Sequence, residues 1–163
     1  MPERRICVLD AGPIIHLDEL GELDLLHVLG KLFVPESLAY EAEKHRPGVA
    51  AKLSAHVVEE PEFMSADLAK AIRAYELNTG EVAALAWAEK FGADLFVSDD
   101  KAARDAADVL GVESTGTLGV ISEAFRGGTI PREKALALLH AIPFQSSLHI
   151  RGTLLSEVIA GLR

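Results

Sequence analysis

The sequence has little cysteine and no long hydrophobic run. Its single cysteine, Cys7, excludes a disulfide framework and a zinc site built from thiolates. Because Cys7 lies in an apolar segment, we interpret it as a core thiol rather than a nucleophile. No apolar run approaches the ~20 residues of a membrane span, and the N-terminus lacks a signal-peptide hydrophobic region. We therefore expect a cytoplasmic protein with no membrane partner.

Aromatic and basic residues are also scarce. Aromatic residues make up 6% of the chain and apolar residues 49%, so the 163 residues can fill one core built mainly from Leu, Val, Ala and Ile. The 16 basic residues face 25 acidic ones, which gives a formal charge of -9. This balance argues against binding of nucleic acid by bulk electrostatics. A substrate that carries phosphate would need local basic residues or bound cations.

The hydrophobic pattern predicts alternating strands and helices, without repeats or linkers. Short apolar strands are expected at 6–9, 32–34, 57–58, 95–97 and 112–115. Helices are expected at 14–20, 23–29, 36–44, between 48 and 57, and at 65–77, 78–92, 101–110, 118–126, 132–139 and 152–162. This alternation favours an α/β fold in three layers, α/β/α, with a central parallel sheet in one domain over residues 1–163.

Acidic residues stand where these strands end or where helices begin. Asp10 follows the first strand, and Asp99 and Asp100 follow the strand at 95–97. Ligand sites in open α/β sheets lie beyond the carboxyl ends of the strands. Glu81 begins a helix that runs back to the strand at 95–97, and Glu41 lies roughly 9 Å along the helix after its strand. We therefore expect all five acids to converge on one edge as a divalent-metal site.

Each acid also has a purely structural interpretation, as a turn residue, a helix cap or a solvated side chain. The candidates are Asp10 in the turn before Gly12, Glu81 in a capping box with Asn78, Asp99 or Asp100 as an N-cap, and Glu41 on a helix surface. However, one cap requires one acid, so the adjacent pair leaves a carboxylate unexplained. Like charges aimed at one edge also repel unless protons or metal ions neutralise them.

Four short motifs follow one another in the chain: LDAGPIIHL, VPESLAYEAE, GEVAALAWA and VSDDKAARDAA. Their order resembles the PIN-domain family of metal-dependent ribonucleases, and the similarity continues through GTLGVISEAFRGGTI to the closing helix. The Gly-Glu and Asp-Asp motifs resemble the branch that contains toxin-like PIN proteins. The resemblance implies a PIN-like fold and a metal-dependent endoribonuclease.

The resemblance also implies roles for individual residues. The catalytic acids and metal ligands would be Asp10, Glu41, Glu81 and Asp100, with Asp99 as an alternative ligand and Ser98 as a hydroxyl that contacts substrate or water. Two positions depart from the pattern. Gly12 stands where many relatives carry serine, and Glu81 replaces the aspartate of other PIN branches.

The implied reaction is hydrolysis of phosphodiester bonds in single-stranded RNA. Hard oxygen ligands select Mg²⁺ or Mn²⁺, and metal-bound water would attack without a protein nucleophile. Lys101 and Arg104 begin directly behind the Asp-Asp turn and are candidate contacts to substrate phosphates, although a solvated helix face also accounts for them. Proteins of this kind often form homodimers and are held by a small antitoxin, so we expect both partners.

Functions of other classes have weaker support. A phosphoacceptor receiver domain would carry its acid pair after the first strand, and a phosphatase with an aspartate nucleophile would need an aspartate where this chain has Gly12. The histidines show no paired metal-ligand spacing, and no serine occupies a G-x-S-x-G turn. The alternative that stays open is a PIN-like module that binds RNA or protein without cutting.

Overall fold

The computed structural model describes residues 5–162, so the domain expected over 1–163 extends beyond the described residues at both ends. Its centre is a five-stranded sheet in the order β3-β2-β1-β4-β5, and every pair of neighbouring strands is parallel. The strands are β1 (Ile6–Leu9), β2 (Lys31–Pro35), β3 (His56–Val58), β4 (Leu95–Val97) and β5 (Ser114–Thr115). The predicted parallel sheet is confirmed.

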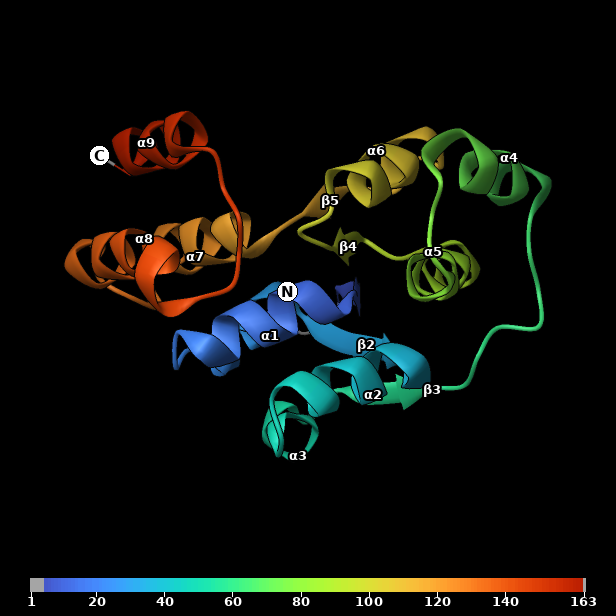
Figure 1. The fold of residues 1–163 in the computed structure, drawn as a ribbon, viewed down its shortest axis with the longest axis horizontal. Coiled ribbons are helices and arrows are strands. Elements are labelled where there is room, and N and C mark those ends of the chain that lie inside the picture. The colour runs from blue at the N-terminus through green and yellow to red at the C-terminus, as the bar shows by residue number, and fades with distance from the viewer. Residues whose placement is uncertain (1–4, 163) are drawn as a thin grey trace.

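The strand order determines which face each helix covers, because crossovers between parallel strands are right-handed. From β1 to β3 the chain moves one way through α1 (Ala11–Glu19), the 3₁₀ helix η2 (Leu23–Leu29), α2 (Glu36–His45) and α3 (Val49–Leu53). From β3 to β5 it moves the other way through α4 (Ala66–Tyr75), α5 (Thr79–Phe91) and α6 (Lys101–Val109). The two groups therefore lie on opposite faces of the sheet (Figure 1). This is the expected three-layer fold.

Three helices complete the chain after β5. Helix α7 (Thr117–Arg126) packs on η2 and α1, α8 (Arg132–Gln145) packs on α7, and α9 (Gly152–Gly161) packs on α8. Figure 1 shows α8 and α9 at the end of the molecule opposite α4 and α5. Helix α9 contains no fully buried residue, so it lies on the surface.

Helix α8 is longer than the sequence pattern predicted. We expected it to end at residue 139, but it continues through Pro143 to Gln145. Proline lacks the N–H that would bond to the preceding turn. Ile142 and Leu139 are nonetheless fully buried, and we infer that burial of this last turn outweighs the missing hydrogen bond.

The core is aliphatic and surrounds the central strands. Cys7, Val8 and Leu9 of β1 and Phe96 and Val97 of β4 are completely inaccessible to solvent. Burial raises the pKa of the Cys7 thiol to about 11, which agrees with a core role.

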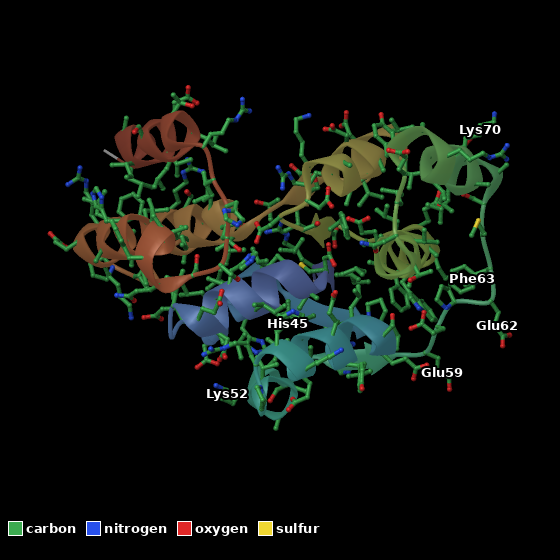
Figure 2. All side chains as sticks on the ribbon, viewed as in Figure 1. His45, Lys52, Glu59, Glu62, Phe63 and Lys70 are labelled. Atoms are coloured by element: carbon green, nitrogen blue, oxygen red, sulfur yellow. The ribbon has the colours of Figure 1, made fainter. Side chains whose placement is uncertain are left out.

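A connection without helix or strand links β3 to α4 over residues 59–65. It passes along the outer side of α5, as the positions of Glu59, Glu62 and Phe63 in Figure 2 show. Trp87 of α5 holds the connection, since its indole N–H donates to the Glu59 carbonyl at 2.7 Å and its ring meets Phe63 edge to face. Trp87 therefore serves packing. Within the described residues 5–162, no helix is long and apolar enough to cross a membrane.

Candidate active site

The register of the sheet brings Asp10 and Ser98 together. Leu9 at the end of β1 pairs with Val97 at the end of β4, and the backbone N–H of Asp10 donates to the Val97 carbonyl at 2.9 Å. The backbone N–H of Ser98 continues the sheet by donating to Thr115 at 2.8 Å. The first residues beyond β1 and β4 therefore lie next to each other at the carboxyl edge of the sheet.

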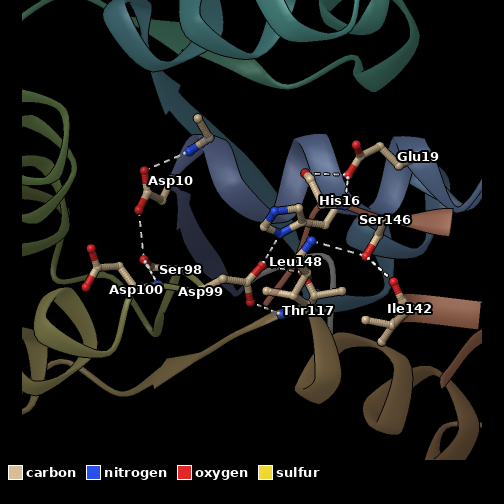
Figure 3. A network of polar contacts seen from close by, with 12 residues as sticks. Asp10, His16, Glu19, Ser98, Asp99, Asp100, Thr117, Ile142, Ser146 and Leu148 are labelled. Atoms are coloured by element: carbon tan, nitrogen blue, oxygen red, sulfur yellow. Dashed lines mark hydrogen bonds and ion pairs between the residues drawn. The ribbon is translucent and has the colours of Figure 1, made fainter. Parts of the chain in front are cut away.

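The Asp10 side chain is held by two hydrogen bonds (Figure 3). The Ser98 hydroxyl donates to Asp10 Oδ2 at 2.7 Å, and the Ala11 backbone N–H donates to Oδ1 at 2.8 Å. Burial raises the pKa of Asp10, and these two hydrogen bonds oppose that rise. The nearby charges of Glu41 and Asp100 raise the pKa further.

The position of Ser98 differs from the role expected of it. Ser98 is fully buried, and its only hydroxyl proton is used in the bond to Asp10. Its oxygen also accepts the Asp100 backbone N–H at 3.1 Å. Ser98 therefore orients the two aspartates and leaves no donor for substrate or water.

Glu81 and Asp100 form a second carboxylate pair at this edge. Glu81 belongs to the capping box of α5, in which its Oε1 accepts the Asn78 N–H at 2.9 Å and its own N–H donates to Asn78 Oδ1 at 2.8 Å. Burial, a hydrogen bond to Asp100 and the charges of Asp100 and Asp10 raise the pKa of Glu81 to about 7. The hydrogen bond with Glu81 lowers the pKa of Asp100. The two pKa values therefore move apart, and Glu81 is the carboxyl that keeps its proton to the higher pH.

The adjacent aspartates of the Asp-Asp motif point in different directions (Figure 3). Asp100 lies on the Asp10 side and also caps α6, since its Oδ1 accepts the Ala102 N–H at 2.8 Å. Asp99 turns toward α1 and α7. Its carboxylate accepts the Thr117 N–H at 2.7 Å, the Thr117 hydroxyl at 2.6 Å and His16 Nδ1 at 2.7 Å.

The contacts of Asp99 account for the carboxylate that a single cap left unexplained. Burial alone would raise the pKa of Asp99, but the hydrogen bonds from His16 and Thr117 lower it overall. Gly116 makes this packing possible, because a Cβ there would lie 2.5 Å from Asp99 Oδ1 and 3.1 Å from the Ser98 carbonyl. Sequence reasoning missed His16 and Thr117: both lie within the quoted motifs, but nothing in the sequence pairs either of them with Asp99.

The other predicted residues lie at the margin of the cluster. Glu41 is exposed on α2 and acts on Asp10 through its charge. Arg104 donates from Nη1 to the Ser98 carbonyl at 3.0 Å and helps to lower the pKa of Asp100. Lys101 is exposed and pairs with Asp105 one helical turn away, at 2.8 Å.

Comparison with known proteins identifies the family. A family model described as a PIN domain matches residues 6–163. The chain belongs to the PIN-domain family. No curated protein matches the chain in a sequence search. PIN domains are in general nucleases and typically use divalent metal ions, so at this coarse level the chain is a hydrolase of the nuclease type.

The donors at the edge of this PIN domain fit a divalent cation by their chemistry. Asp10, Glu81 and Asp100 supply only oxygen, and their charges lie close enough to add to burial in raising the pKa values of Asp10 and Glu81. Within residues 5–162, no three His, Cys, Asp or Glu side chains are already arranged around a single point. Mg²⁺ does not require such a cage, because it keeps several waters and uses one or two carboxylates.

The raised pKa of Glu81 predicts how the stability of this PIN domain depends on pH when EDTA keeps it free of metal. The folded-state pKa of Glu81, about 7, lies above the ordinary value of 4.5, so protonated Glu81 stabilises the fold below pH ~4.5. This contribution to the free energy of unfolding is lost as the pH rises through 7. Glu81→Gln removes the titration. Relative to wild type, the variant should therefore gain stability between pH 5 and pH 8, as measured by urea denaturation at each pH.

A matched control is Glu133→Gln, at an exposed position of α8. This variant should follow the wild-type pH dependence. If the stabilities of wild type and Glu81→Gln changed in parallel over the same pH range, that result would contradict a buried Glu81 with a raised pKa.

Proposed function

We propose that this PIN domain is a Mg²⁺- or Mn²⁺-dependent endoribonuclease that hydrolyses single-stranded RNA. The observation that carries the proposal is the grouping of Asp10, Glu81 and Asp100 at the carboxyl edge of the sheet, where two of them resist ionisation. Such crowding is unfavourable for folding alone and is relieved by a cation. The family supplies the chemical class of the reaction.

In this proposal each acid has a defined task. Asp10 and Asp100 hold the metal, and Glu81 either joins them or orients the attacking water after losing its proton. Glu41, exposed on α2, acts from the outer side of the cluster. When bound, the divalent ions supply a water of lowered pKa and neutralise the leaving oxygen. Ser98 keeps Asp10 oriented, and Arg104 faces the substrate phosphate.

A second function has its own support. A PIN domain that binds RNA or protein without cutting would also show a folded carboxylate cluster without a preformed ligand set, as seen among residues 5–162. The net charge of -9 similarly suits weak rather than tight contact with RNA. Cleavage and metal binding, measured separately, distinguish the two functions.

Cleavage of a single-stranded RNA with Mn²⁺ or Mg²⁺ is the decisive measurement. We expect internal cuts that leave 5′-phosphate and 3′-hydroxyl ends, because water rather than the ribose 2′-hydroxyl attacks. Loss of a metal ligand should reduce the rate by at least ~100-fold in Asp10→Ala and Asp100→Ala. EDTA should stop the reaction, and the exposed Asp67→Ala on α4 should cut like wild type.

Metal binding is followed independently by thermal unfolding. Mg²⁺ or Mn²⁺ should raise the melting temperature of the wild type, and by less in Asp10→Asn and Asp100→Asn. Stabilisation without cleavage of any RNA would favour the binding module. Products with 2′,3′-cyclic phosphate, or full activity of Asp10→Ala, would rule out the proposed mechanism.

We further propose that the chain is a homodimer and the toxin of a pair with a small antitoxin protein. Helix α5 packs against β1, β2 and β4, whereas α9 has no fully buried residue and is the candidate interface. Light scattering should therefore give a dimer at micromolar concentration, and expression should slow growth in wild type but not in Asp10→Ala. A monomer would contradict the homodimer, and equal growth of both strains would contradict the toxin function.

A further inference from the structure

A cavity of about 630 Å³ lies beside the carboxylate cluster. Helix α6 contributes Lys101 and Arg104 to its lining, and the end of β5 and the start of α7 contribute Thr115 and Gly116. The remaining wall comes from the segment before α9 and from α9 itself. This volume is in the range of pockets that hold small organic ligands.

The C-terminal wall is apolar and is fastened to the rest of the domain. Leu148, Leu154 and Val158 line the cavity. The segment is tied to α1, because Glu19 Oε1 accepts both the N–H and the hydroxyl of Ser147 at 2.8 Å. Leu148 lines the cavity together with Asp99 and Gly116, so the wall ends beside the Asp99 network.

The cavity lining is formally neutral, whereas the whole chain carries a charge of -9. Its basic residues are Lys101, Arg104 and Arg151, and its acidic residues are Asp99, Asp105 and Asp108. Two of these acids are already engaged, Asp99 by Thr117 and His16 and Asp105 by Lys101. In the described part of the chain, Arg151 has no ion pair, and Arg104 uses Nη1 for the Ser98 carbonyl. The two guanidinium groups therefore keep donors for an anion.

The cavity adjoins the turn that carries Asp100 of the proposed reaction centre. Asp99, which precedes Asp100 in the chain and points away from it, lies in the cavity wall, whereas Asp10, Glu81 and Asp100 do not line it. Arg104 lies between the cavity and Asp100, because it lines the cavity and its charge acts on Asp100. A phosphate bound by Arg104 would thus lie next to the carboxylates, with the cavity open to the adjoining nucleotide.

We propose that this cavity is a subsite for one nucleotide of single-stranded RNA adjoining the scissile phosphate. The base lies against the apolar wall of Leu148, Leu154 and Val158, and the phosphate binds Arg104 and Arg151. Guanidinium groups match phosphate in a bidentate manner, and an unpaired base has an apolar face that a double helix would hide. The subsite rests on the proposed function for its RNA, but its test does not require cleavage.

Equilibrium binding of a fluorescein-labelled ten-nucleotide RNA, followed by anisotropy, provides the test. The Asp10→Asn background with Mg²⁺ limits cutting during the measurement. Adding Arg151→Ala should weaken binding about tenfold, since one charge-assisted phosphate contact is lost. The slope of log affinity against log salt should fall by about 0.7, the value for one contact on a single strand.

Three further variants make the test specific. Arg151→Lys should restore the salt slope, because it restores the charge, and Leu154→Asp should weaken binding by placing a carboxylate in the apolar wall. Leu154 is 42% exposed, so this change leaves the fold intact. Arg73→Ala, at an exposed position of α4 that does not line the cavity, should bind like the background.

The outcomes separate the subsite from the reaction. Lost affinity in Arg151→Ala and Leu154→Asp supports the subsite even if the wild type cuts no RNA. Unchanged affinity and salt slope in both variants would overturn it, even if the wild type cuts RNA. Equal losses in Arg151→Ala and Arg73→Ala would also overturn it, because they would indicate diffuse charge.

Discussion

The hydrogen bond from Ser98 to Asp10 joins the ends of the two strands on which the candidate site depends. It forms because β1 and β4 are parallel neighbours whose last residues, Leu9 and Val97, are paired. Strand β4 is far from β1 in the sequence, so the contact exists only after the sheet has assembled. Once formed, it holds a buried carboxylate that would otherwise lack a partner at one oxygen.

The two acids in the turn after β4 have different roles: Asp99 has a structural role, and Asp100 belongs to the candidate active site. Asp99 binds α1 and α7 through His16 and Thr117, and it thereby fixes the backbone from which Asp100 projects. Asp100 caps α6, and its pKa is lowered by the hydrogen bond with Glu81, whose own position is set by the capping box of α5. Structural and chemical roles therefore coincide in the same residues, because a helix N-terminus that stabilises a carboxylate also orients it.

Arg104 likewise has two roles, at the place where the substrate is proposed to bind. Arg104 bonds to the Ser98 carbonyl and also lines the cavity beside the cluster, so one side chain connects the Ser-Asp-Asp turn with the proposed nucleotide subsite. The opposite wall comes from the last part of the chain, which reaches this place because Glu19 holds Ser147. The subsite is thus assembled from segments that carry no shared motif.

The sequence by itself determined the short apolar strands, the parallel sheet and the acids at strand ends. These features are local or follow from alternation, because strand length, helix caps and crossover handedness depend on neighbouring residues. Asp10, Glu81 and Asp100 could be chosen in this way. The length of α8 could not, since burial of Ile142 by distant residues outweighs the local effect of Pro143.

Only the tertiary structure decided that Ser98 orients Asp10 rather than substrate, that Asp99 bonds to His16 and Thr117, and that Arg151 borders the cavity. Each of these depends on a contact between residues remote in sequence, whose direction is set by packing.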